Sequence, residues 1–159
     1  MLNSNINYKL KAILDVCQTH NKRMQYAQDF LSNIFPLDAE TYSQLSQEQI
    51  SHTDQLIYRF SQLQDTMENK LFPLILQGLG EYSQNLPFID ILNKLEKLSV
   101  IESSVKWLRL RETRNLVTHE YPYGEKEIVD GLNELHQQSQ YLSSVLENLL
   151  SYIKRRNWL

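Results

Sequence analysis

The stretch INYKLKAILDVCQTHNKRMQYAQDFLSNI, residues 6–34, is the most informative part of the sequence for the fold. Its apolar and small side chains, together with His20, recur at steps that alternate between four and three residues. A helix has about 3.6 residues per turn, so this spacing aligns them along one side of a long helix, as in helical bundles. We therefore predict a helix over 6–34 whose buried line is Ile6, Leu10, Ile13, Cys17, His20, Met24, Ala27, Leu31 and Ile34.

A second long helix is predicted after a short polar loop. Ser46 and Gln49 have the spacing of a capping box, which satisfies free N–H groups at a helix start. Pro73 is expected to kink or loosen the last turn, and Gly78 and Gly80 to end the helix. The expected buried line is Ile50, Thr53, Ile57, Phe60, Gln64, Met67, Leu71 and Leu74. Two such helices joined by a short loop form an antiparallel hairpin, which is half of a bundle.

Three more helices follow in the prediction. A short one starts at Leu86-Pro87-Phe88 and buries Leu92, Leu95 and Leu98, a fourth covers about Glu102–Glu120, and a fifth covers about Glu125–Lys154. The sequence contains no internal repeat and no linker long enough to separate domains. We predict a single all-α domain over 1–159, folded as an antiparallel up-and-down helical bundle of four to five helices.

Composition narrows the class of protein. The 159 residues include four Gly and four Pro, which favours helices over a turn-rich β fold. A single cysteine, Cys17, excludes an internal disulfide and a cysteine-based zinc site. The sequence has neither a signal-peptide pattern nor an apolar run that could span a membrane, so we expect a cytoplasmic protein. The net charge of −3 is unlike that of a strongly basic nucleic-acid-binding domain. Any contact with RNA must therefore come from a local basic patch or a cleft between two copies.

The fourth predicted helix carries the residues with chemical potential. On a helical wheel, Val105, Leu110, Leu116 and Val117 gather on one side, interrupted by Arg109. The other side is a polar arc, which contains, in order around the axis, Arg114, Thr118, Arg111, Asn115, His119 and Glu112. Asn115 and His119 are four residues apart and can hydrogen-bond to each other.

Arginine and histidine together suit the cleavage of a phosphodiester. A guanidinium offers two parallel donors to a phosphate and keeps its charge, and an imidazole can accept or donate a proton near neutral pH. His119 would then act as general base or acid, and the arginines would stabilise the charge that develops on phosphorus. The same residue types are also common on solvated helix surfaces that have no function.

The segment Arg114-Asn115-x-x-x-His119-x-Tyr121 resembles the R-x4-H-x-Y signature of HEPN domains of the HepT type. The resemblance extends over about 107–153, and the segment 54–60 is weakly similar to an earlier helix of these proteins. The first 45 residues match no motif of the family. The resemblance implies a HEPN-type toxin that cuts RNA without a metal ion or other cofactor, with Arg114 and His119 as catalytic residues. Asn115, Arg111, Thr118 and Glu112 would support the site or bind substrate.

The resemblance also implies partners. Proteins of this type form homodimers in which both copies of the motif line a shared cleft, and such a cleft would concentrate the charge of Arg111 and Arg114. Their antitoxin is a minimal nucleotidyltransferase that transfers AMP to the tyrosine of the motif, here Tyr121. The added phosphate would compete for the arginines and close the cleft.

Two other functions remain open at this point. The chain could be a non-catalytic substrate-binding or accessory subunit of a nucleotidyltransferase, which would use the same fold and which the acidic net charge slightly favours. It could instead be a purely structural bundle, although that would leave the polar arc without a role.

Overall fold

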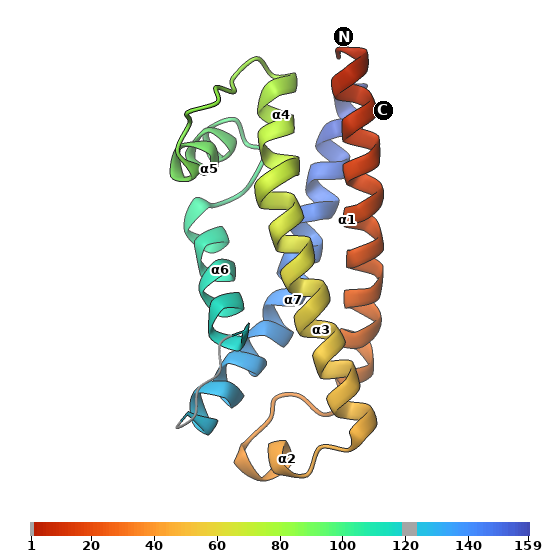
Figure 1. The fold of residues 1–159 in the computed structure, drawn as a ribbon, viewed down its shortest axis with the longest axis vertical. Coiled ribbons are helices and arrows are strands. Elements are labelled where there is room, and N and C mark those ends of the chain that lie inside the picture. Colours follow the sequence, from red (N-terminus) through yellow and green to blue (C-terminus); the bar gives the residue numbers. More distant parts are fainter. Residues whose placement is uncertain (1, 119–123) are drawn as a thin grey trace.

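The chain folds as an antiparallel bundle of helices, shown in a computed structural model that describes residues 2–118 and 124–159. Helix α1 (Ser4–Leu31) descends from the N-terminus, and α3 (Gln47–Thr66) returns beside it. Helix α6 (Ser104–Thr118) descends again, and α7 (Glu125–Arg155) returns to the end where both termini lie (Figure 1). The short helices α2 (Ala39–Ser43) and α5 (Phe88–Lys97) lie in the connections. All regular structure in the described ranges is helical, which confirms the predicted all-α up-and-down bundle.

Local sequence signals account for the start of α3. The Ser46 hydroxyl accepts a hydrogen bond from the Gln49 backbone N–H at 3.1 Å, and the Gln49 side chain accepts one from the Ser46 N–H at 2.8 Å. The predicted capping box is therefore confirmed. Asp38 and Thr41 form a second capping box, which begins α2 within a stretch expected to be a loop.

The second long helix is interrupted rather than simply kinked. A π-helical turn, η1 (Met67–Leu71), joins α3 to α4 (Phe72–Gly78), and the Phe72 N–H donates to the carbonyl of Met67, five residues back. Pro73 lies directly after this turn and cannot donate to the carbonyl of Asn69, four residues earlier. In a regular α-helix the ring of Pro73 would also clash with that carbonyl, and the wider turn makes room for it. The turn contains Glu68, a polar residue that is buried.

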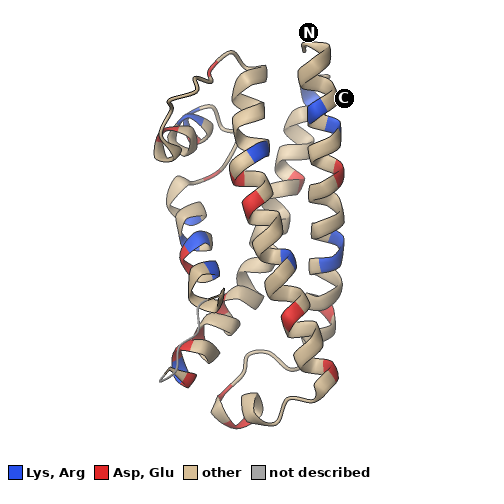
Figure 2. Cartoon of the chain, viewed as in Figure 1, with Lys and Arg blue, Asp and Glu red and all other residues tan. Residues whose placement is uncertain are grey.

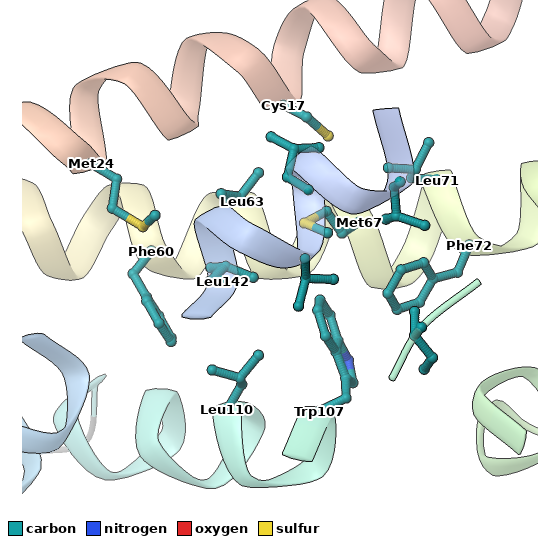
Figure 3. Close-up of a cluster of buried hydrophobic side chains, with 14 of the residues drawn as sticks. Cys17, Met24, Phe60, Leu63, Met67, Leu71, Phe72, Trp107, Leu110 and Leu142 are labelled. Atoms are coloured by element: carbon teal, nitrogen blue, oxygen red, sulfur yellow. The ribbon is translucent and has the colours of Figure 1, made fainter. Parts of the chain in front are cut away.

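The core lies between all four long helices. Figure 3 shows Trp107 and Leu110 of α6 pointing towards side chains from α3 and its continuation, with Cys17 contributed by α1. The Trp107 ring packs at a tilt against Phe72, with 4.7 Å between ring centroids. Cys17 is fully buried, and burial raises the pKa of its thiol to about 12, so the thiol is inert as a nucleophile.

Helix α6 buries only part of the apolar side found on the helical wheel: Leu110 is fully buried and Val117 packs against the core. Its buried residues are Ser104, Trp107, Leu110 and Thr113, whereas Val105 is 76% exposed. Val105 is exposed because packing against both α3 and α7, rather than hydrophobicity alone, selects the buried face of α6. A related correction applies to α5, which buries Ile91 and leaves Leu98 exposed at its end.

The last turn of α6 lies close against α7. A Cβ atom added at Gly131 of α7 would come within 2.7 Å of Leu116 and 3.2 Å of Val117, so glycine permits this approach. No helix within 2–118 and 124–159 combines the length and apolar character needed to cross a membrane.

Candidate functional site

The candidate site is the face of α6 that meets α3 and η1. Of the predicted site residues, the structure describes Arg111, Glu112, Arg114, Asn115 and Thr118. The predicted catalytic His119 and the predicted modification site Tyr121 lie outside the described residues.

Arg114 is held by two side chains of α3. Its Nη1 donates to the side-chain oxygen of Gln64 at 2.7 Å and also to the carboxylate of Asp65, with which it forms an ion pair. The Arg114 side chain is 27% exposed, so it lies at the rim of the interface rather than within it. Both Nη1 protons are thereby engaged, and Nε and Nη2 form no hydrogen bond within the described ranges. That second edge is the pair of parallel donors that a phosphate or carboxylate binds.

Arg111 forms a second ion pair with α3's continuation. Its Nε lies 3.1 Å from Oε1 of Glu68, and its guanidinium lies over the ring of Phe88 in α5, 4.7 Å from the centroid. Contacts on both sides thus fix the orientation of Arg111 although its side chain is 42% exposed.

Glu68 is the centre of this cluster. The same carboxylate oxygen accepts a hydrogen bond from the Trp107 indole N–H at 2.9 Å and from the Gln64 amide at 3.0 Å. The residue is only 6% exposed. Burial raises the pKa of Glu68, opposed by the hydrogen bond from Trp107 and by the positive charges of Arg111 and Arg114. One buried carboxylate therefore links the core tryptophan to the arginines at the rim.

The predicted polar arc is divided between two environments. Arg111 and Arg114 turn towards α3, whereas Glu112, Asn115 and Thr118 are exposed to solvent. The Thr118 hydroxyl donates to the backbone carbonyl of Arg114 at 2.9 Å, a local helix contact that any surface threonine can make. The helix therefore offers a fixed arginine edge beside a solvated polar face.

The partners of the arginines were not predicted as site residues. Gln64 was placed correctly on the buried line of the second helix, and a buried polar side chain requires a hydrogen-bonding partner. That requirement was the one signal in the sequence that pointed to a polar cluster. Asp65 and Glu68 gave no pattern of their own, and neither spacing nor composition relates them to partners that lie 39 to 49 positions later.

Charges within this cluster balance. The positive charges of Arg111 and Arg114 face the carboxylates of Glu68 and Asp65, so the cluster has little net charge when all four groups are ionised. Within the described ranges, no group of three or more His, Cys, Asp and Glu side chains is arranged to hold a metal ion. No protein-family model, curated protein or solved structure matches the chain.

Proposed function

We propose that this protein is a HEPN-type endoribonuclease that cleaves RNA without a metal ion, with Arg114 as the phosphate ligand and His119 as the proton-transfer group. The main support for the proposal is the way in which the Arg114 guanidinium is oriented by its hydrogen bonds. Gln64 and Asp65 occupy Nη1, and the Nε–Nη2 edge of this fixed guanidinium, which forms no hydrogen bond within 2–118 and 124–159, suits a phosphate. A group held in place before the reaction stabilises developing charge without paying for reorganisation.

The chemistry follows from these two groups. His119 accepts the proton of a ribose 2′-OH, and the oxygen attacks the adjacent phosphorus. Negative charge increases on the phosphorus oxygens as the new bond forms, and Arg114 stabilises it through two hydrogen bonds. The bond to the 5′-oxygen then breaks, and that oxygen takes up the proton held by His119, directly or through water, which returns His119 to its starting form. The products are a 2′,3′-cyclic phosphate and a free 5′-hydroxyl.

The resemblance supplies the proposed partners. A homodimer would place two copies of the motif beside one cleft, and a minimal nucleotidyltransferase would silence the enzyme by transferring AMP to Tyr121. AMP at that position adds a phosphate that can occupy the same edge of Arg114 that the substrate needs.

The test is RNA cleavage by purified protein in the presence of EDTA. We expect Arg114→Gln to lower the rate by about 100-fold or more, as removal of one charge-stabilising donor does in other enzymes. His119→Gln should lower it by about 100-fold to 10,000-fold through loss of proton transfer. The matched control is Arg109→Gln on the same helix, because Arg109 is exposed and bonded to Glu134 at 2.8 Å, away from Gln64 and Asp65. Equal activity in all four proteins would refute the proposed roles.

One observation favours a second candidate, a non-catalytic accessory subunit of a nucleotidyltransferase. Both arginines of the cluster face carboxylates, so their charges are compensated within one chain. Compensation of this kind weakens attraction for a polyanion. Co-expression with a nucleotidyltransferase separates the two functions. AMP on Tyr121 by mass spectrometry, with cleavage only by unmodified protein, supports the ribonuclease, and a stable complex with neither modification nor cleavage supports the accessory subunit.

A further inference from the structure

A second group of basic residues lies where α1 and α3 run side by side, shown as blue segments of the two helices (Figure 2). Lys22 and Arg23 are exposed residues of α1, and Arg59 of α3 hydrogen-bonds to His20 of α1. Six ion pairs occur within the described ranges, and none of them includes these three residues. The acidic residues on the same helices, including Asp15, Asp29 and Asp54, do not neutralise them through close contacts. We call Lys22, Arg23 and Arg59 the α1/α3 basic face.

Arg59 is fixed in this face. Its Nη1 donates to Nδ1 of His20 at 2.9 Å, and its guanidinium lies over the ring of Tyr58, 5.1 Å from the centroid. Because arginine has donors only, Nδ1 of His20 must be the acceptor, which places the proton of the neutral ring on Nε2. The Nε of Arg59 is buried and has no hydrogen-bond partner among the residues that the structure describes. The cation is thus partly removed from water without a carboxylate to balance it.

The electrostatic effect of the cluster is visible in its histidine. Burial lowers the pKa of His20, and the positive charges of Arg59 and Arg23 lower it further. Like charges brought this close repel each other, and an anion bound among them would relieve the repulsion.

Exposed aromatic rings flank the cations. Tyr26 is 70% exposed and Tyr58 is 51% exposed. A hollow of about 570 Å³ lies beside Tyr26, lined by Thr19, Lys22, Arg23, Tyr26 and Gln55. Aromatic rings next to basic residues are the combination that single-stranded nucleic acids bind, because bases stack on the rings while phosphates contact the cations.

We propose that the α1/α3 basic face binds single-stranded RNA, with Lys22, Arg23 and Arg59 on the phosphates and Tyr26 and Tyr58 stacked on bases. The choice of RNA as the polyanion rests on the proposed ribonuclease function. The face lies on α3 away from the Gln64–Asp65 side that holds Arg114, so it is a binding surface separate from the cleavage site. It supplies the positive surface that an acidic protein needs in order to hold RNA.

The test measures binding without cleavage. The full chain is titrated into a fluorescent 2′-O-methyl oligouridine of about 10 nucleotides, a length within the usual site size of single-strand binding surfaces, and anisotropy is recorded. This probe has no 2′-OH and cannot be cleaved by the proposed reaction. We expect Lys22→Gln/Arg23→Gln to raise Kd by about tenfold and to reduce the salt dependence of log Kd by about 1.4, because two phosphate contacts are lost. Tyr26→Ala should raise Kd by about tenfold through loss of stacking.

The matched control is Lys9→Gln/Lys11→Gln, which removes the same charge from exposed positions on the same helix. Because Lys22 and Arg23 are also exposed, both double variants should fold normally, and circular dichroism checks this. Equal weakening by the two double variants would overturn the proposal, because binding would then depend on net charge alone. If polyglutamate displaced the probe as effectively as unlabelled oligouridine does, the choice of RNA as the ligand would be overturned.

The outcome is distinguishable from that of the proposed function. If the protein cleaves RNA and Lys22→Gln/Arg23→Gln binds the probe as tightly as wild type, the α1/α3 basic face fails and the cleavage site stands. If the probe binds through this face but no protein cleaves RNA, the binding surface stands and the ribonuclease fails.

Discussion

Two groups of arginines in this molecule have opposite surroundings. On α6, Arg111 and Arg114 each face a carboxylate from the helix next to them, Glu68 and Asp65. On the α1/α3 basic face, Arg59 meets a neutral histidine and a tyrosine instead. A carboxylate fixes the direction of a guanidinium but cancels its field, whereas a neutral partner fixes the direction and leaves the field intact. The first arrangement suits a group that must be placed accurately, and the second suits a surface that must attract a polyanion.

Glu68 is the carboxylate that most clearly distinguishes the α6 cluster from the α1/α3 basic face, so its removal should have the largest effect on stability. Glu68→Ala leaves the buried Trp107 indole N–H without an acceptor and takes the charge partner from Arg111. We expect a loss of about 3 kcal/mol in the free energy of unfolding, from an unsatisfied buried donor and a small cavity. Urea unfolding measures it. The control is Glu112→Ala, an exposed carboxylate on α6, for which a change within about 0.5 kcal/mol is expected. Similar losses in the two variants would show that Glu68 does not organise the cluster.

A smaller effect on stability is expected when a carboxylate of the α6 cluster is replaced by a neutral group, so that Arg114, like Arg59, has no charged partner. Asp65→Asn keeps an oxygen that can accept from Arg114 but removes the negative charge. Because this pair is partly exposed, the stability change should be at most about 1 kcal/mol. Affinity for the 2′-O-methyl oligouridine should rise by a few-fold, because the field of Arg114 is no longer cancelled. Unfolding and anisotropy titrations check both effects, and a fall in affinity would contradict the role assigned to charge compensation.

The smallest expected effects are opposite responses to acid. Burial raises the pKa of Glu68 above its ordinary value of 4.5, so its contribution to stability is greatest below pH 4.5 and is lost as pH rises through the raised pKa. Burial and neighbouring cations lower the pKa of His20 below 6.5, so stability is lost as pH falls below 6.5 towards the lowered pKa. Acidification should therefore favour wild type over Glu68→Gln, and His20→Gln over wild type. The urea midpoints of wild type, Glu68→Gln and His20→Gln at a series of pH values test these two predictions. If acidification favoured wild type over both variants, or both variants over wild type, the environment assigned to Glu68 or to His20 would be wrong.

Much of the fold could be predicted from local patterns. The spacing along residues 6–34 correctly identified Leu10, Cys17, Met24 and Leu31 as buried, because a helix repeats its directions every 3.6 residues whatever it packs against. The capping box at Ser46 is equally local, since both of its hydrogen bonds join residues three apart. The π-helical turn before Pro73 was predicted only as a loosening, since proline shows that a helix must adjust but not how it does so.

The candidate site was less predictable. The wheel for the helix predicted over about Glu102–Glu120 recognised that Arg111 and Arg114 belong to a polar arc, but it did not separate them from Asn115 and Glu112, which are exposed to solvent. It also grouped Val105 with the apolar side, whereas Val105 is exposed in the structure. The roles of His119 and Tyr121 remain predictions from the resemblance, together with the ribonuclease activity, the homodimer and the nucleotidyltransferase partner.

The sequence alone determined where helices form and which residue types each one offers, because periodicity, caps and helix-breaking residues act within a few positions of each other. Tertiary structure alone decided what each arginine meets. Glu68 lies 39 residues before Trp107, and Arg59 lies 39 residues after His20, so neither contact leaves a mark in local spacing. Helix packing brings these side chains together, and the dielectric and charge of the resulting contacts set their chemistry. The motif at Arg114 was therefore visible in the sequence, but the carboxylates that compensate it and the uncompensated α1/α3 basic face appeared only in the fold.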